Sequence, residues 1–278
     1  MTTPSDAPLF DVDAPAPLTP VERLLALADL YTQHNDLIDT LFSGRTPQPD
    51  PDAYAASARR LEREALAAIK AVRQQPLPAI DSVKGAVVRL KQLTHLTGGA
   101  TRYLTAAQHV RPPDDAQHQL LDPRHGVGQY VQLARELTAL APLTIIGSAM
   151  VIAGRLPSRA RSTTTVPGMT KDHRAALLEV ARGHIAVTEY DGNQRVYHHE
   201  TAVDAEMLSQ LEAQVLVIRE PASAAPFFTG GPLRDRARLT AHGISALSTV
   251  VVSPLPASRP AVGPVAAPTT VNSSRARR

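Results

Sequence analysis

The chain contains no cysteine and no tryptophan, and only 4% of its 278 residues are aromatic. Without cysteine the protein has neither disulfides nor thiolate ligands for a metal, which suits a reducing compartment. Without tryptophan, the core must be built mainly from Leu, Ile, Val and Ala. No basic segment followed by an apolar segment opens the chain, so we expect no secretory signal and a cytoplasmic location.

Lysine is also scarce, and arginine supplies most of the positive charge. The net charge of +3 is distributed unevenly. Residues 162–253 hold eight basic and ten acidic side chains, whereas residues 155–161 and 254–278 hold seven arginines and no acidic residue. DNA-binding domains normally have a basic surface of their own, because phosphate contacts dominate their affinity. Any attraction for DNA is therefore predicted to come from the segments that flank residues 162–253.

Helical periodicity dominates the first half of the chain. Thr19-Pro20-Val21-Glu22 has the pattern of a capping box with proline at the first helical position, which predicts a helix over about 20–42. Apolar residues three and four apart predict further helices over about 51–75, 81–111 and 127–153. Gly98-Gly99 predicts a kink or break in the third of these. Four helices with short connections predict an antiparallel helical bundle over residues 19–156.

The last of these helices raises the question of a membrane span. No charged residue occurs between Leu137 and Gly154, and Arg155 follows at once, as in a short span with a positive flank. Pro142 and several Ser, Thr and Gly residues interrupt the apolar run. We therefore interpret it as a buried helix and expect no membrane contact.

The remainder of the chain alternates polar segments with short periodic ones. Residues 1–18 and 254–278 have no periodicity and are predicted to be disordered tails, the second of them basic, and residues 157–169 are predicted to be a linker. Between the linker and the basic tail, the pattern predicts several short elements. They are a helix from Thr170 to Arg182, a hairpin over residues 185–198, a helix over 203–214, a strand over 215–218, a loop rich in Pro and Gly, and a strand over 236–240.

The order helix, strand, loop, strand in residues 203–240 is that of a winged helix, and the residues resemble a known family. Leu208-x-x-Leu211-Glu212, Leu216-Val217-x-Arg219 and Asp235-Arg236-x-x-Leu239-Thr240-x-x-Gly243 resemble the second half of a MarR- or PadR-type winged-helix regulator. The resemblance covers about residues 203–247 and implies a recognition helix followed by a two-stranded wing. The expected fold is therefore mainly α with a small β component: a bundle followed by a winged-helix-like α+β domain over residues 170–253.

Two departures from the family pattern accompany this resemblance. The family's glycine before the Leu-Val pair is Val215 here, so we expect the turn that ends the recognition helix to be made differently. The family's short helix before the recognition helix is replaced by the hairpin over residues 185–198.

The chemistry expected of such a domain is contact with DNA. On the recognition helix only Ser209 and Gln210 have side chains suited to base edges, and Asp204, Glu206 and Glu212 would face phosphates. Arg195, Arg236 and Arg238 are the candidates for a basic edge on the hairpin and wing. The leading hypothesis is a non-catalytic regulator-like protein that contacts DNA weakly, through its basic linker and tail.

Two alternatives stay open. Phe227 and Phe228 lie side by side in the wing loop, and exposed aromatic residues are enriched where proteins bind one another. They suggest an adaptor that binds a protein partner, or forms a homo-oligomer, without binding DNA. The second alternative is a bundle with a three-histidine metal site, as in DinB-like hydrolases, built from His34, His95 and His125. No His-x-x-x-His or Glu-x-x-His spacing supports it, so we expect no metal, cofactor or catalytic residue.

Overall fold

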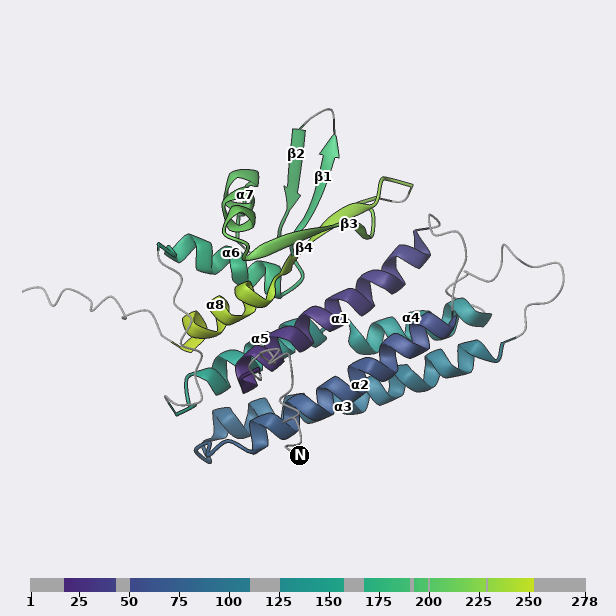
Figure 1. The fold of residues 1–278 in the computed structure, drawn as a ribbon. Helices are drawn as coiled ribbons and strands as arrows, with labels where there is room; N and C mark the ends of the chain where they lie inside the picture. The colour runs from purple at the N-terminus through teal and green to yellow at the C-terminus, as the bar shows by residue number, and fades with distance from the viewer. Residues whose placement is uncertain are drawn as a thin grey trace, which may run out of the picture.

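The computed structural model describes residues 18–43, 51–110, 126–157, 168–190, 193–199, 201–228 and 230–252. The predicted terminal tails and most of the predicted linker lie outside these residues. Five helices form an N-terminal helical unit (Figure 1). They are α1 (Pro20–Phe42), α2 (Pro51–Arg73), α3 (Asp81–Gln108), α4 (Gly126–Thr138) and α5 (Ala141–Ala153).

The C-terminal unit, residues 168–252, combines three helices with one sheet. Its elements are α6 (Lys171–Ala181), β1 (Ala186–Tyr190), β2 (Asn193–Tyr197), α7 (Ala205–Ala213), β3 (Val217–Ala224), β4 (Arg234–Leu239) and α8 (Ala241–Val252). The strand order is β2-β1-β4-β3, and each neighbouring pair is antiparallel. The prediction of a mainly α protein with a small β component is confirmed.

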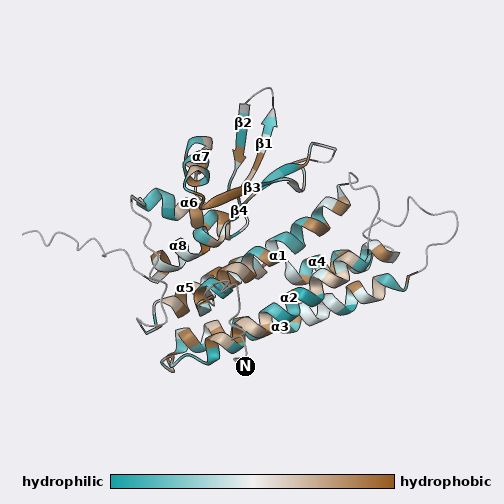
Figure 2. Ribbon diagram, in the orientation of Figure 1, coloured by the Kyte–Doolittle hydropathy of each residue, from teal (hydrophilic) through white to brown (hydrophobic). Residues whose placement is uncertain are grey.

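Helix α1 lies between the two halves of the molecule. Figure 1 shows α2 and α3 on one side of it and the sheet with α6 and α8 on the other. One buried apolar cluster includes residues of α1, α2, α3 and α5 together with residues of α6, β1, α7, β3, β4 and α8. In Figure 2 the apolar residues gather along α5 and in the part of the sheet beside α8. The two units therefore share a core.

The predicted start of α1 is present in the structure and has a second use. The Thr19 backbone N–H donates to Glu22 Oε2 over 2.8 Å, and the Glu22 N–H donates to Thr19 Oγ1 over 3.3 Å, which completes the capping box. The same Glu22 carboxylate accepts a 2.6 Å hydrogen bond from the Ser245 hydroxyl of α8. The cap of the first helix thus also joins the last helix.

The predicted break at Gly98-Gly99 is wrong, because α3 runs through both glycines without interruption. A Cβ added to Gly99 would lie 3.1 Å from Leu137 of α4, and one added to Gly98 would lie 3.4 Å from Glu62 of α2. The glycines allow α3 to approach both neighbours closely. Packing against two helices offsets their low helix propensity, which costs about 1 kcal/mol each.

The helix predicted over residues 127–153 is instead two helices. It breaks at Ala139 and Leu140, and Pro142 then occupies the first turn of α5, where its missing N–H costs nothing. By length and composition the segment Gly126–Ala153 is apolar enough to cross a membrane. Half of its most apolar 18-residue stretch is buried inside the protein.

The strand after α7 is longer than its sequence suggested. β3 continues through Pro221 to Ala224, with a bulge between Glu220 and Ala224 that leaves Ala222 at a φ of +50°. Proline is tolerated there because β3 is an edge strand and the bulge needs no ladder hydrogen bond from residue 221. Asp235 accepts the freed Ala222 N–H over 2.8 Å.

α7 ends in a turn at Val215, the position at which the family has a glycine. The Leu216 N–H donates to Leu211 O over 2.9 Å and the Val215 N–H donates to Glu212 O over 2.8 Å. This is a Schellman turn, and its left-handed position is occupied by Val215 at a φ of +56°. The expectation of a different turn is wrong: the turn is the usual one, and a β-branched residue occupies the glycine position.

Replacing Val215 by Gly should therefore stabilise the protein by about 1 kcal/mol, because the left-handed conformation costs an L-residue roughly 1–2 kcal/mol. Val215 is 62% exposed, so little burial is lost. Thermal or urea unfolding measures the change. Ala213→Gly, two residues earlier at the last residue of α7, is the control and should destabilise by about 1 kcal/mol. Equal losses in both variants would mean that Val215 is not strained.

Candidate functional site

The most extensive polar network connects α1 with β4. On α1 the residues Asp29, Thr32 and Asp36 recur at intervals of three and four, so they lie on one face of the helix. On β4, Arg236 and Arg238 are two residues apart and share one face of the strand. The structure places the two faces against each other and joins residues about 200 positions apart in the chain.

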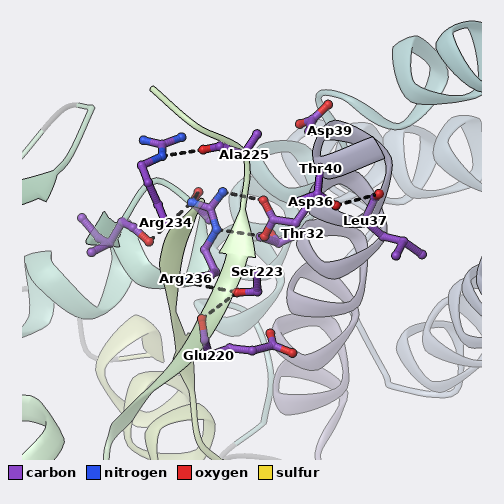
Figure 3. A network of polar contacts seen from close by, with 12 residues as sticks. Thr32, Asp36, Leu37, Asp39, Thr40, Glu220, Ser223, Ala225, Arg234 and Arg236 are labelled. Carbon is purple, nitrogen blue, oxygen red and sulfur yellow. Dashed lines mark hydrogen bonds and ion pairs between the residues drawn. The ribbon is translucent and has the colours of Figure 1, made fainter. Parts of the chain in front are cut away.

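Arg236 is at the centre of the network and is 9% exposed. Its guanidinium binds Asp36 with both ends of the fork, Nη2 to Oδ1 over 2.5 Å and Nε to Oδ2 over 2.9 Å (Figure 3). Its Nη1 donates to the carbonyl of Gly183 over 2.6 Å. Gly183 has a φ of +75°, and a Cβ there would lie 2.6 Å from Thr32 Oγ1. Only glycine permits this approach of the α6–β1 turn to α1.

Arg238 extends the same network along α1. It is 6% exposed, and its Nη1 lies 3.1 Å from Asp29 Oδ1. Its Nη2 lies 3.7 Å from Asp36, and its Nε donates to Glu220 of β3. Burial raises the pKa of Asp36 above its ordinary value, while the hydrogen bond and charge of Arg236 and the charge of Arg238 act in the opposite direction. Removing either arginine would leave a buried carboxylate with less compensation.

A cavity of about 180 Å³ opens beside this network, between α1, the α4–α5 connection and the α6–β1 turn. Its charged lining residues have partners: Arg135 binds Asp39 through two hydrogen bonds of 2.7 and 2.8 Å, and Arg182 and His184 both bind the buried Glu179. Pockets for small molecules usually measure roughly 300–1,000 Å³. The size of the cavity and its internal pairing favour a structural junction between the units over a ligand site.

The structure thus places two predicted DNA-contact residues, Arg236 and Arg238, inside the protein. Both guanidiniums are bound to carboxylates of α1, so contact with phosphates would require these ion pairs to open. Figure 3 shows Arg234 pointing away from α1, toward the start of the β3–β4 loop, where it donates to Ala225 O over 2.6 Å. It also lies over the ring of Tyr197, 5.2 Å from the centroid.

The other predicted DNA-contact residues are exposed and lie apart from this network. Arg195 is on β2, the outer strand of the sheet opposite β3. On α7, Ser209 donates to Ala205 O over 2.8 Å. Gln210 lies 3.1 Å from His173 of α6 and 3.4 Å from Glu206. The residues proposed to read base edges are therefore engaged in contacts within the unit.

The two predicted partner-contact residues are the most exposed large apolar side chains of the C-terminal unit. Phe227 is 70% exposed and Phe228 is 65% exposed. The Phe227 ring lies 5.0 Å from that of Tyr197, which connects the wing loop to β2. The contact with Tyr197 thus fixes Phe227 against β2, and both phenylalanines present apolar surface to solvent.

The histidines considered for a metal do not converge in the part of the chain that the structure describes. His34 is buried against Ser57 of α2, whereas His95 is exposed on α3, and His125 lies outside the described residues. Within the described ranges, no three His, Asp or Glu side chains lie close enough together to hold a metal ion.

His34 has a different significance. It is 1% exposed, its Nδ1 lies 3.0 Å from Ser57 Oγ, and its Nε2 has no hydrogen-bond partner. Burial, with a smaller contribution from the charge of Arg135, lowers the pKa of His34 to about 4. The folded protein therefore holds this ring neutral at pH values where an unfolded chain would protonate it.

The free energy of unfolding should consequently fall by about 3 kcal/mol as the pH drops from 6.5 toward 4, because each unit of pKa difference is worth about 1.4 kcal/mol. The contribution of His34 is fully present above pH 6.5 and is lost as the pH approaches the folded-state value. Urea unfolding of the protein and of His34→Gln over this range isolates it. If both lose stability in parallel, the loss comes from other groups.

Parts of this site could have been found in the sequence. The interval of seven between Asp29 and Asp36 on a predicted helix, and the period-two arginines of β4, each mark a polar face. Neither pattern shows that the two faces meet, because no local signal connects residues so far apart. The helix predicted from Thr170 to Arg182 is present as α6, but the close approach of the following Gly183 to Thr32 was not foreseeable.

Comparisons of this chain with protein-family models, with curated proteins and with solved structures found no match.

Proposed function

We propose that this chain is a non-catalytic, regulator-like adaptor. In this proposal an antiparallel helical bundle supports a winged-helix-like C-terminal unit, and that unit contacts proteins instead of reading DNA. The sheet order supports the winged-helix comparison, because β1, β4 and β3 lie side by side with α7 directly before β3. In this comparison the hairpin of β1 and β2 would replace the family's short helix before the recognition helix.

The observation that carries the proposal is the burial of Arg236 and Arg238 against α1. A wing that contacts phosphates needs free cations, and these two are bound to Asp36 and Asp29. Opening a buried ion pair leaves uncompensated charge and costs several kcal/mol. The free energy gained from a phosphate contact would have to exceed that cost. Arg236 and Arg238 are therefore better suited to holding β4 against α1.

The exposed surface of α7 supports the same proposal. Asp204 accepts the Met207 N–H as the helix cap, and Glu206, two residues later in the first turn, is exposed. Two carboxylates at this end of the helix would repel a phosphate backbone. In contrast, Phe227 and Phe228 present the apolar surface that protein partners use at the centre of an interface.

A second candidate function is weak contact with DNA through residues 254–278. The observation that favours it is their composition, which includes four arginines and no acidic residue. Such contact would be insensitive to sequence and steeply dependent on salt, because it would come from phosphate contacts and counterion release.

A salt titration with duplex DNA tests the proposal. The full chain, a variant lacking residues 254–278 and Gln210→Ala are compared on one arbitrary sequence and on a library of random sequences. We expect no preferred sequence, no effect of Gln210→Ala, and loss of any residual binding on deletion of residues 254–278. Selection of one sequence, with binding that depends on Gln210 and survives the deletion, would overturn the adaptor proposal.

A further inference from the structure

An open groove of about 720 Å³ lies between α2 and α3, on the outer surface of the helical unit and far from the C-terminal unit. Its α2 side is formed by residues 62, 66, 69 and 73, whose intervals of four, three and four place them on one helical stripe. We call it the α2–α3 groove. Figure 1 shows that α2 and α3 are on the side of α1 opposite the sheet.

The floor of the α2–α3 groove is apolar. Leu66 is 55% exposed, although it lies between two packed helices, and Ile69 packs against the buried core from the groove side. Gly98 contributes no side chain, so the groove remains open over α3. When a partner covers an exposed leucine in a concave site, the binding free energy becomes more favourable by about 25 cal/mol for each Å² of apolar surface removed from water.

The margins of the groove are positively charged. Arg73 on α2 and Lys91, His95 and Arg102 on α3 line it, together with a single carboxylate, Glu62. Along the whole of α2 and α3 there are nine Lys and Arg residues, all exposed, and four Asp and Glu residues. Within the described part of the chain, only Lys84 of these nine forms an ion pair, with Asp81 over 3.7 Å. Of the other eight, Arg73, Lys91 and Arg102 line the groove and are therefore available to an acidic partner bound there.

The shape of the groove indicates the kind of partner. Two packed antiparallel helices leave a furrow into which a third helix fits, with apolar residues at every third or fourth position pointing into the floor. Residues 62–73 span about 17 Å at 1.5 Å per residue, which corresponds to about three helical turns. Acidic residues flanking the apolar stripe of such a helix would meet the cations on both margins.

We propose that the α2–α3 groove binds an acidic amphipathic helix of a partner protein. Nucleic acid fits less well, because its phosphates would lie over Leu66 and near Glu62, where they find apolar surface and a like charge. The inference rests on the proposed adaptor function and adds a partner class to it. The two remain separable in experiment, since DNA binding by the C-terminal residues does not involve α2 or α3.

The probe is a labelled synthetic amphipathic peptide of about 15 residues, with leucines at every third or fourth position and glutamates on both flanks. Its binding to the full chain is followed by fluorescence anisotropy. A second peptide has lysine in place of every glutamate. We expect the acidic peptide to bind, and the basic peptide to bind at least about tenfold more weakly, because the margins of the groove are cationic.

Charge reversal locates the binding site. The double variant Lys91→Glu with Arg102→Glu should weaken acidic-peptide binding about tenfold or more, and Leu66→Ser should weaken it about fivefold or more. The matched control is Arg60→Glu on α2 with Arg89→Glu on α3, which makes the same charge change at exposed positions that do not line the groove. It should change binding less than about twofold. Thermal unfolding of each variant confirms that it is folded.

Four results would overturn the proposal. The control pair could weaken binding as much as the groove pair, which would indicate a diffuse charge effect. Both peptides could bind equally. Duplex DNA could bind more tightly than the acidic peptide at the same salt and lose that binding on the groove reversal, which would identify the surface as a nucleic-acid site. Finally, the chain could sediment as a dimer that the groove reversal dissociates, which would identify a second copy as the occupant.

Discussion

Replacing Arg236 by Ala should lower the free energy of unfolding by about 3–5 kcal/mol, the cost of removing one partner from a buried ion pair. The loss is large because Asp36 of α1 remains buried while two hydrogen bonds to it disappear. The Gly183 carbonyl loses its 2.6 Å donor as well. Denaturation in urea, followed by the helical signal at constant pH, measures the change.

Two further variants separate the ion pair from the general effect of deleting an arginine. Arg219→Ala removes a guanidinium whose pair with Glu212 is at the surface of the C-terminal unit, so it should cost about 1 kcal/mol or less. Asp36→Leu combined with Arg236→Met replaces the buried pair by apolar groups and should recover much of the loss. If Arg236→Ala costs no more than Arg219→Ala, the Arg236 pair does not stabilise the junction.

Replacing Gly243 by Ala should destabilise the protein by about 3 kcal/mol or more, at the upper end of the cost of overpacking a core. A Cβ at this position in the first turn of α8 would lie 2.0 Å from the carbonyl oxygen of Leu216. The carbonyl belongs to the backbone and the position of the Cβ is fixed by its Cα, so no side-chain rotation relieves the contact, and α8 must move away from the start of β3.

The control for this prediction is Gly147→Ala in α5. That glycine is also helical, but a Cβ added there meets nothing within 4 Å. The substitution should stabilise the protein by up to about 1 kcal/mol, because alanine has the higher helix propensity. Opposite signs for the two substitutions in thermal unfolding would establish the close approach of α8. A neutral effect of Gly243→Ala would show that α8 is free to shift.

The sequence predicted the elements whose signals are local. The capping box at Thr19, the apolar spacing along α2 and the helix from Thr170 to Arg182 all depend on residues within one or two turns, and each is present in the structure. The apolar stripe of α2 is buried, with Leu61 only 2% exposed. Local patterns determine such features because the interactions that stabilise them are close in the chain.

The predictions that failed required knowledge of distant neighbours. Gly98-Gly99 was expected to break a helix, but contacts with α2 and α4 keep α3 continuous. The β4 arginines have the same local pattern whether they face solvent or a partner, and only the position of α1 distinguishes the two situations. The numbers of acidic and basic residues in the N-terminal half are nearly equal overall, and this balance conceals the excess of cations on α2 and α3.

The pairing of α1 with β4 also has a consequence for the order in which the chain is made. Asp36 leaves the ribosome 200 residues before Arg236. At a translation rate of roughly 5–20 residues per second, Arg236 and Arg238 are synthesised about 10–40 s after the carboxylates of α1 with which they pair. During that interval the carboxylates are hydrated and keep this face of the nascent helix soluble, although its opposite face is already apolar enough to collapse onto α2. β4 then covers the polar face of α1, whose hydrated carboxylates have until then kept it from packing against other parts of the chain.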